Sequence, residues 1–379
     1  MTDIGTGITT DVAVIGGGVV GAALAYELAA AGAGVVLLDG DKPGRASAAG
    51  AGIASPQTFA EADEDWYRFG ASALEHLRKL VGRLGEDGVE LGPSAFGECG
   101  SLVIALAEHE DPWFQEVAGL ALGRDSEVAE VPPSQAQGLF PPLARPWRAL
   151  HSPRSCRVDG RLLTEALRIA ATRRGVTLVS HEVTGVALSS AGGATVTAGD
   201  VVVSCATVAI AAGAWSKALA GQLGIVLPVF PTKGEIVHMG TSADGAQWPI
   251  VQPVLNFYLV PWPDGRVACG GTFEPGAGFD LRPTAKGARD LLREALTIAP
   301  GLAEATLLEA RVGLRPASPD ERPMLGSMAS RPDVHVCTGH GANGLLLGPY
   351  SAALVASGIL SGSPPDELPP FDPARFTAS

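Results

Sequence analysis

A glycine pattern near the N-terminus constrains the fold of this chain more than any other feature. A short apolar run at residues 11–15 leads directly into Gly16-Gly-Gly-Val-Val-Gly21, which fits G-x-G-x-x-G. A stretch rich in alanine and leucine follows, and a second apolar run then ends at Asp39. An ordinary glycine-rich turn lacks these flanking elements and the distal acid. The order of strand, tight turn, helix and strand therefore predicts a dinucleotide-binding unit.

Each part of the motif has a physical role in binding a pyrophosphate. Gly16 permits the tight turn, Gly18 lets a pyrophosphate approach the backbone, and Gly21 lets the helix pack closely on the strand. The first turn of the helix contains Val19 and Val20. Its N–H groups and partial positive charge are expected to face the phosphates.

The acid after the second run indicates which dinucleotide is bound. Asp39 lies 18 residues after the last glycine of the motif. At that distance a carboxylate can accept hydrogen bonds from both ribose hydroxyls, which favours an unphosphorylated adenosine ribose. FAD or NAD is therefore expected rather than NADP.

The remainder of the chain does not continue with the strand–helix units of a plain NAD enzyme. Residues 44–53 form a loop of small residues, where backbone could press against a flat ring. A helical stretch near 162–172 precedes short strands over 176–210. Residues 334–347 then predict a strand, a glycine loop and a second helix N-terminus, which is built like another anion site.

Several segments are more specific than the glycine motif. Residues 311–326 contain Gly-Leu-Arg-Pro-Ala-Ser-Pro-Asp, and 211–216 and 338–344 read Ala-Ala-Gly-Ala-Trp-Ser and Thr-Gly-His-Gly-Ala-Asn-Gly. Residues 231–235, Pro-Thr-Lys-Gly-Glu, are similar to P-x-R-G-Q with lysine in place of arginine. Together with Tyr-Leu-Val-Pro at 258–261, they make almost the whole chain resemble the FAD-dependent D-amino-acid oxidase, glycine oxidase and D-amino-acid dehydrogenase group.

The resemblance implies an α/β fold with a discontinuous Rossmann-type FAD-binding domain. A second, antiparallel-sheet α+β domain would cover the flavin and bind the substrate. We expect the FAD-binding domain to comprise residues 1–85, 151–225 and 326–379. The substrate domain would comprise residues 86–150 and 226–325.

The resemblance assigns the substrate carboxylate to Arg315, whose planar guanidinium can hold a carboxylate through two charge-assisted bonds. The alternative is a surface arginine paired with Asp320 or Glu321. Tyr258 could donate to the same carboxylate, or it could be an amphipathic core residue. Asn256 lies two residues earlier, on the same face of a regular strand, and could line the pocket. A role without substrate contact is equally compatible with its position.

The loop at 339–346 is expected to direct N–H groups at the flavin pyrimidine edge, where negative charge accumulates on reduction. His340, within that loop, is more typical of a packed residue than of a catalytic one. No cysteine lies at 312–316, so the resemblance implies non-covalent FAD, and no metal site is expected. The further expected cofactor-binding residues are Gly40, Ser47, Gly52, Ile53, Val183, Gly213, Trp215, Gly339, Gly341, Asn343, Gly344 and Leu345.

The resemblance also implies a reaction. Hydride would pass from the substrate Cα to flavin N5, and the imino acid would hydrolyse to a 2-oxo acid and ammonia. Oxygen or another acceptor would then take the electrons. A D-amino acid is the leading substrate. Glycine oxidases carry an arginine shortly after the Gly-His pair, and this chain has the pair but lacks the arginine, which weakens an assignment as a glycine oxidase. The alternatives are a secondary amine such as sarcosine or proline, and the flavin subunit of an electron-transferring complex.

Composition excludes other classes of function. The chain has 27 basic and 40 acidic residues and a formal net charge of −13, so it would repel nucleic acid. Its five cysteines form no C-x-x-C pair, which suits a reducing compartment. The first ten residues lack the basic residues of a signal peptide, and Glu27 interrupts the apolar stretch that follows. A cytoplasmic enzyme without an integral membrane segment, and possibly a homo-oligomer, is expected.

Overall fold

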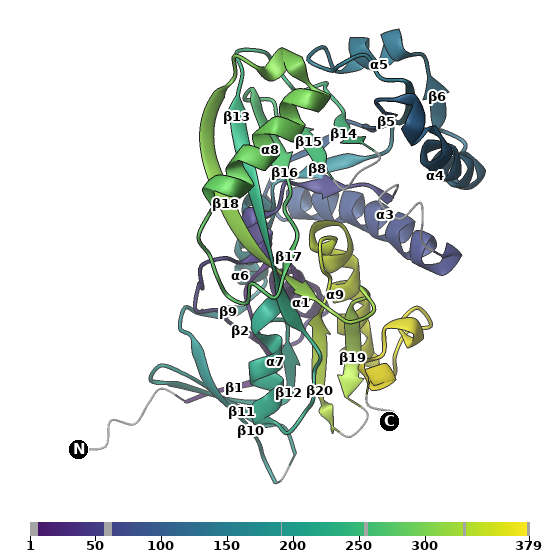
Figure 1. The fold of residues 1–379 in the computed structure, drawn as a ribbon. Helices are drawn as coiled ribbons and strands as arrows, with labels where there is room; N and C mark the ends of the chain where they lie inside the picture. Colours follow the sequence, from purple (N-terminus) through teal and green to yellow (C-terminus); the bar gives the residue numbers. More distant parts are fainter. Residues whose placement is uncertain (1–6, 57–62, 191, 254–256, 329–330, 377–379) are drawn as a thin grey trace.

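Two large β-sheets lie at opposite ends of the molecule (Figure 1). The computed structural model describes residues 7–56, 63–190, 192–253, 257–328 and 331–376. The long helix α3 (Glu64–Glu86) lies at the level between the two sheets (Figure 1). It begins where the side chain of Asp63 accepts a hydrogen bond from the Trp66 backbone N–H (2.8 Å).

The first sheet is the nucleotide-binding type that the glycine motif predicts. Its central strand pairs in parallel with one neighbour on each side, and the four residues before the glycine turn are buried. Such burial on both faces is the reason for their uninterrupted apolar character. In the described residues the sheet contains β1 (Gly7–Ile15), β2 (Val35–Leu38), β9 (Thr177–Val179), β10 (Val183–Leu188), β11 (Ala194–Ala198), β12 (Val201–Ile210), β19 (Met324–Met328) and β20 (Arg331–Thr338).

Alternate residues of β1 and β2 pack on opposite faces of this sheet. Val12 and Val14 join a core with α1 (Val19–Ala30), α3, α6 (Gly160–Arg173) and α9 (Gly344–Ser361). Ala13 and Ile15 join a second core with residues of β9 to β12 and of α7 (Ser216–Gln222). The sheet is therefore covered on both sides, as a parallel arrangement requires.

The second sheet is antiparallel apart from one parallel pair, β5 with β14. Helix α8 (Ala285–Ile298) packs its apolar face, which includes Leu291 and Ile298, against it. Among the described residues the sheet contains β5 (Ser101–Ala105), β6 (Ala129–Val131), β7 (Arg148–Ser152), β13 (Phe230–Gly240), β14 (Ile250–Pro253), β15 (Tyr258–Pro261), β16 (Arg266–Gly270), β17 (Glu274–Pro275) and β18 (Thr306–Ala317).

Smaller elements connect these two parts. A short sheet is formed by β3 (Ile53–Ala54), β8 (Cys156–Val158) and β4 (Phe96–Glu98). The shorter helices are α2 (Ala46–Ala49), α4 (Asp111–Arg124) and α5 (Pro133–Leu139). The 3-10 turns are η2 (Glu108–Glu110), η3 (Gly213–Trp215), η4 (Pro300–Leu302), η5 (Pro369–Phe371) and η6 (Pro373–Phe376). The expected α/β class with two different sheets is confirmed, whereas the residue boundaries between the domains stay a prediction.

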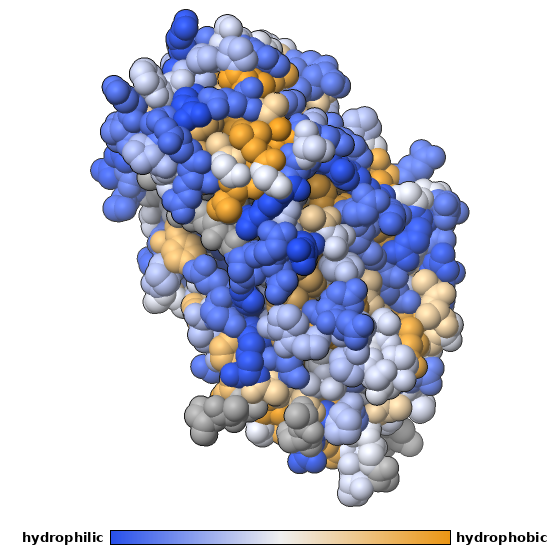
Figure 2. All heavy atoms as spheres, turned by 90° about the vertical axis from the view of Figure 1, so that its right-hand side faces the viewer, coloured by the Kyte–Doolittle hydropathy of each residue, from blue (hydrophilic) through white to orange (hydrophobic). Residues whose placement is uncertain are grey.

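Apolar residues are concentrated in a few places on the surface. The face seen in Figure 2 is mostly hydrophilic, and its apolar atoms gather in the upper part, at the end that holds the second sheet. In the described part of the chain, α9 is apolar and long enough to cross a membrane by length and composition. However, 56% of it is buried inside the protein, where it packs on α1 and α3. Its apolar character is thus accounted for by the core.

Candidate active site

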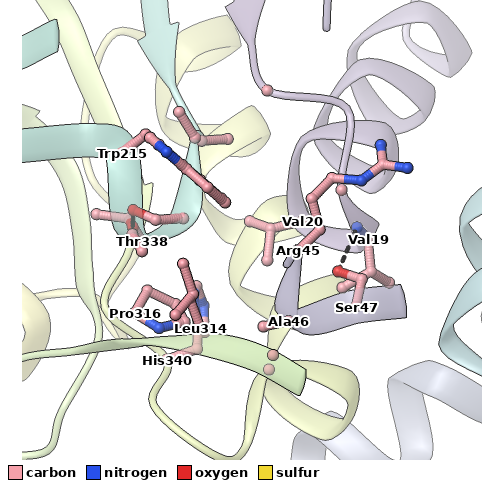
Figure 3. A pocket seen from close by; sticks show the side chains of 18 of the residues that line it. Val19, Val20, Arg45, Ala46, Ser47, Trp215, Leu314, Pro316, Thr338 and His340 are labelled. Atoms are coloured by element: carbon pink, nitrogen blue, oxygen red, sulfur yellow. Dashed lines mark hydrogen bonds between the residues drawn. The ribbon is translucent and has the colours of Figure 1, made fainter. Parts of the chain in front are cut away.

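A cavity of about 520 Å³ lies between the two sheets. The carboxyl ends of the parallel strands meet there, through Ile15 of β1, Leu38 of β2 and Thr338 of β20. Ligands of open α/β sheets bind at this edge. From the second sheet, β13, β15 and β18 complete the wall, so the cavity is the place where a cofactor and a substrate could meet (Figure 3).

The glycine turn lines one end of this cavity with bare backbone. Gly16 has a φ of +105°, and a Cβ there would lie 2.5 Å from the Ala211 carbonyl oxygen. A Cβ at Gly21 would lie 1.8 Å from the carbonyl oxygen of Gly16, so only glycine permits this approach of α1 to β1. A Cβ at Gly18 would lie 3.2 Å from Ser47 Oγ. The glycines thus let the turn pack closely on its neighbours, and Gly16, Gly17 and Gly18 line the cavity.

Two helix N-termini contribute to the same cavity. Helix α1 has Gly18 as its N-cap without a side-chain cap, and the Val19 N–H donates to Ser47 Oγ (3.1 Å; Figure 3). Helix α9 begins after Asn343, which also makes no side-chain cap bond, and its residues Gly344 and Leu345 line the cavity. Uncapped N–H groups and two helix dipoles suit the phosphates and a flavin that becomes negative on reduction. The donor set therefore fits FAD.

Asp39 is held by two arginines that were not among the predicted site residues. Its Oδ2 accepts from Arg45 Nη1 (2.8 Å) and from Arg168 Nη1 (3.3 Å). Both bonds use the same oxygen, so a ribose hydroxyl would share it or bind the other one. Arg45 follows Asp39 by only six residues and could have been noticed in the sequence. Arg168 lies 129 residues away along the chain, and no local pattern connects it to Asp39.

Most predicted cofactor residues come together in the cavity. Those that line it are Gly16, Gly18, Val19, Val20, Asp39, Gly40, Ser47, Gly52, Ile53, Val183, Gly213, Trp215, Gly341, Gly344 and Leu345. Gly21, Gly339 and Asn343 do not line it: Gly21 lies at the helix–strand contact, and Asn343 is the N-cap of α9. The contacts of each with the cofactor stay a prediction.

Residues of α2 and β18 also line the cavity; they lie in segments that the sequence patterns singled out, but they were not predicted individually as site residues. They include Ala46, Ala49, Leu314 and Pro316 (Figure 3). A Cβ at Gly313 would lie 2.7 Å from Ala49 Cβ, so a glycine lets β18 pack directly on α2. For Ala46 and Ala49 the signal in the sequence is only a high content of small residues, which does not distinguish a cofactor wall from an ordinary turn. Leu314 and Pro316 flank Arg315 in the Gly-Leu-Arg-Pro segment.

Arg315 lies at the substrate end of the cavity, on β18 opposite Thr232 of β13. Its Nη1 donates to the Thr272 carbonyl oxygen (2.9 Å). A Cβ at Gly234 would lie 2.1 Å from Nη1, so the guanidinium occupies the space that this glycine leaves. No carboxylate pairs with Arg315 in the part of the chain that the structure describes, and Asp320 binds Arg375 instead (2.7 Å).

The phenol of Tyr258 lies beside this guanidinium. A Cβ at Gly270 or at Gly271 would lie 2.6 or 2.8 Å from its Oη. Burial raises the pKa of Tyr258, while the charge of Arg315 and its hydrogen bond to the phenol oppose that increase. The phenol is thus neutral and retains a proton to donate. Asn256, the third predicted substrate residue, lies outside the described residues.

His340 lines the cavity next to Pro316 (Figure 3). Only 2% of it is exposed, and burial lowers the pKa of its imidazole to about 4. The ring is therefore neutral at pH 7. Its Nε2 has no hydrogen-bond partner among the described residues.

The chain is similar to known proteins over most of its length. The family model described as FAD dependent oxidoreductase (DAO) matches residues 11–357. An uncharacterized oxidoreductase of Bacillus subtilis, YurR, is 33% identical, with 96% of this chain and 99% of that protein covered. The glycine oxidase of Pseudomonas aeruginosa is 32% identical, with 96% and 98% covered.

A solved structure gives the same result. The crystal structure of iminodiacetate oxidase from Chelativorans sp. BNC1 superimposes with a TM-score of 0.88 at 34% sequence identity. The match covers 96% of this chain and 98% of that one. The similarity extends over both sheets and is not limited to the glycine motif.

Proposed function

The chain belongs to the FAD-dependent oxidoreductase (DAO) family, and we propose that it oxidises the CH–NH bond of a small amino acid. The observation that carries this proposal is the pairing of Arg315 and Tyr258 at one end of a cavity whose other end is a glycine-lined dinucleotide site. One cavity thus has a group for a carboxylate and a site for an oxidant.

Bound FAD supplies the two-electron acceptor for this chemistry. The glycine turn and the N-termini of α1 and α9 would hold its phosphates and its ring. Asp39 would bind the adenosine ribose. Ser47, whose Oγ accepts a hydrogen bond from the Val19 N–H at the start of α1, would bind near the phosphates.

The substrate would be oriented by its carboxylate. Arg315 would bind that carboxylate through the guanidinium N–H groups that do not donate to the Thr272 carbonyl oxygen. The neutral Tyr258 phenol would donate a hydrogen bond to the same carboxylate. Fixing the carboxylate limits the positions that the neighbouring Cα can take in the cavity, and orientation of this kind lowers the barrier without a general base.

The products follow from the electron balance. Removal of two electrons and two protons from the carbon–nitrogen bond of a primary amine leaves an imino acid. Water then hydrolyses the imino acid to a 2-oxo acid and ammonia. The D configuration of the substrate follows from the family resemblance alone, and the experiment below tests it.

A secondary amine is the second candidate. Its support is the 34% identity over 96% of the chain to an iminodiacetate oxidase, a protein whose named substrate is a secondary amine with two carboxylates. The same carboxylate clamp would serve, and the cleaved product would then be an aldehyde or keto acid and a primary amine.

The proposal is tested by mixing the oxidised holoprotein anaerobically with D-, L- and N-methyl amino acids, glycine and iminodiacetate. The expected result is loss of the yellow flavin absorbance with one class of these compounds. Return of the colour in air, with peroxide, would identify an oxidase. If no compound bleaches the flavin, the proposal is wrong.

Arg315→Leu then tests the site. The variant should retain FAD but require roughly 100-fold or more substrate, because the partly buried charge partner of the carboxylate is lost. Arg293→Leu, which removes an exposed arginine of α8, is the matched control and should behave as wild type. Unchanged turnover in Arg315→Leu would contradict the assignment.

A further inference from the structure

An ion pair is buried in the second sheet directly behind the substrate end of the cavity. Lys233 and Glu235 of β13 are each 1% exposed, and Lys233 Nζ lies 3.0 Å from Glu235 Oε1. Replacing a buried ion pair by apolar residues is often neutral or stabilising, so such a pair is weak evidence for a role in stability. Its position next to Arg315 suggests another role.

The pair lies on the face of β13 that is turned away from the cavity. Gly234 and Ile236, which alternate with it along the strand, line the cavity. On the opposite face, Glu235 accepts hydrogen bonds from the backbone N–H and the hydroxyl of Thr284 (2.9 and 3.0 Å), the N-cap of α8. The Glu235 carboxylate is therefore held by three polar contacts: the Lys233 ammonium, the Thr284 N–H and the Thr284 hydroxyl.

Lys233 also reaches the segment that holds Arg315. Its Nζ lies 3.6 Å from Glu274 Oε2, and the other oxygen of Glu274 accepts from the Thr272 hydroxyl (2.8 Å). That hydroxyl also accepts from the Glu235 backbone N–H (2.9 Å), and the Thr272 N–H donates to the Glu235 carbonyl oxygen (3.0 Å). Thr272 is thus held at its amide and at its side chain.

The carbonyl of Thr272 is the acceptor for Arg315 Nη1 at 2.9 Å. A continuous chain of polar contacts therefore runs from Lys233 through Glu274 and Thr272 to the guanidinium. Burial alone would lower the pKa of Lys233, but its hydrogen bond to Glu235 and the charges of Glu235 and Glu274 raise it. The Lys233 ammonium stays charged, so these polar contacts persist at neutral pH.

We propose that Lys233, acting through Glu274 and Thr272, is a positioning residue that fixes the Arg315 guanidinium for the substrate carboxylate. The inference rests on the proposed function, because that function assigns the carboxylate to Arg315. Lys233 itself does not touch the substrate. Its effect should appear in carboxylate binding and depend on Arg315 being present.

The test measures the Kd of acetate, a carboxylate that cannot be oxidised as an amino acid, from the change in flavin absorbance of the oxidised holoprotein. Thr272→Val, Glu274→Gln and Lys233→Met should each raise this Kd by about 3- to 10-fold. Lys233→Arg should restore it to within about 3-fold of wild type, because a guanidinium can pair with both carboxylates. Lys286→Met, which removes an exposed ion pair on α8, is the control and should have no effect.

The same variants are then made in an Arg315→Lys background. If the network acts through the guanidinium, their effect on the acetate Kd disappears there; an equal effect in both backgrounds would overturn the proposal. Should Lys233→Met fail to fold, Thr272→Val and the partly exposed Glu274→Gln still decide the question. Wild-type acetate affinity in Arg315→Lys alone would refute the proposed function. Weak binding in Arg315→Lys, together with no effect of Thr272→Val and Glu274→Gln in the otherwise wild-type protein, would refute only this inference.

Discussion

The two ends of the cavity are built by different means. At the nucleotide end much of the wall is backbone, supplied by Gly16 to Gly18 and by the N-termini of α1 and α9. At the substrate end the wall is side chain, supplied by Arg315 and Tyr258 from separate strands of the second sheet. The glycine turn and the start of α1 are encoded in one short segment, whereas the side-chain end exists only after distant strands pair.

Substitutions at the two ends of the cavity should therefore have different effects. A substitution of Gly16 or Gly21 in the glycine turn must displace backbone, so it should cost both cofactor and stability. A substitution at the substrate end can remove one polar group, so it should cost substrate affinity while the flavin stays bound.

Gly21→Val should abolish FAD binding and lower the free energy of unfolding by about 3 kcal/mol, as overpacking against backbone does. The reason is that a Cβ at this position would lie 1.8 Å from the Gly16 carbonyl oxygen. Flavin absorbance per chain and urea denaturation measure the two effects. A stable, yellow Gly21→Val protein would show that the close approach of α1 to β1 is not required.

Gly82→Ala is the matched control for this substitution. Gly82 lies within α3, and a Cβ there would meet no atom within 4 Å. Alanine should therefore leave FAD bound and raise the free energy of unfolding by up to about 1 kcal/mol.

Acidification should destabilise both ends, because each sheet contains a buried neutral histidine. Burial lowers the pKa of His238 in β13 and of His335 in β20 to about 4; the charge of Arg311 also lowers that of His238. The unfolded chain binds these protons near the ordinary histidine pKa of about 6.5. The free energy of unfolding should thus fall as pH drops from about 6.5 to 4, by up to ~1.4 kcal/mol per pH unit for each histidine.

His238→Phe should reduce the slope of the free energy of unfolding against pH by the contribution of one histidine. No hydrogen bond would be lost, since neither ring nitrogen has a partner among the described residues. Urea unfolding between pH 5 and 7.5, as an approximate working range, measures it. Substitution of the exposed His109 by Gln should change nothing. If His238→Phe and a corresponding His335→Phe change the slopes of separate unfolding transitions, the two ends are also separate units of stability.

Tyr258→Phe should give the smallest effect. Loss of one neutral hydrogen-bond donor costs about 1 kcal/mol, which is roughly a 5-fold increase in the acetate Kd. FAD content should not change, because the phenol lies at the substrate end. Tyr67→Phe, which removes a hydroxyl on α3, is the control. Loss of flavin from Tyr258→Phe would contradict the separation of the two ends.

Local patterns allowed much of the nucleotide end to be predicted. The strand, turn and helix around Gly16 were found because their signals lie within one stretch of chain. The first strand nevertheless begins at Gly7 and not at Asp11, because residues 7–10 pair with Val202 to Cys205 of β12. That extension depends on a neighbour far away in the sequence, which no local pattern specifies.

The substrate end was predicted only where a family motif marked it. Arg315 and Tyr258 were identified by resemblance, but the acceptor carbonyl of Thr272 and the pair of Lys233 with Glu235 were not. Lysine and glutamate two residues apart are equally compatible with an exposed strand face. Only the packing of α8 shows that this face is buried.

The sequence by itself determined the dinucleotide unit, the family and the FAD cofactor, because glycine positions and a few contiguous motifs carry them. The tertiary structure alone decided which arginines hold Asp39, and which polar groups stand behind Arg315. Those contacts join residues as far apart as 129 positions along the chain. Charged side chains are read in a sequence by type, but their partners are set by the pairing of strands and the burial that pairing creates.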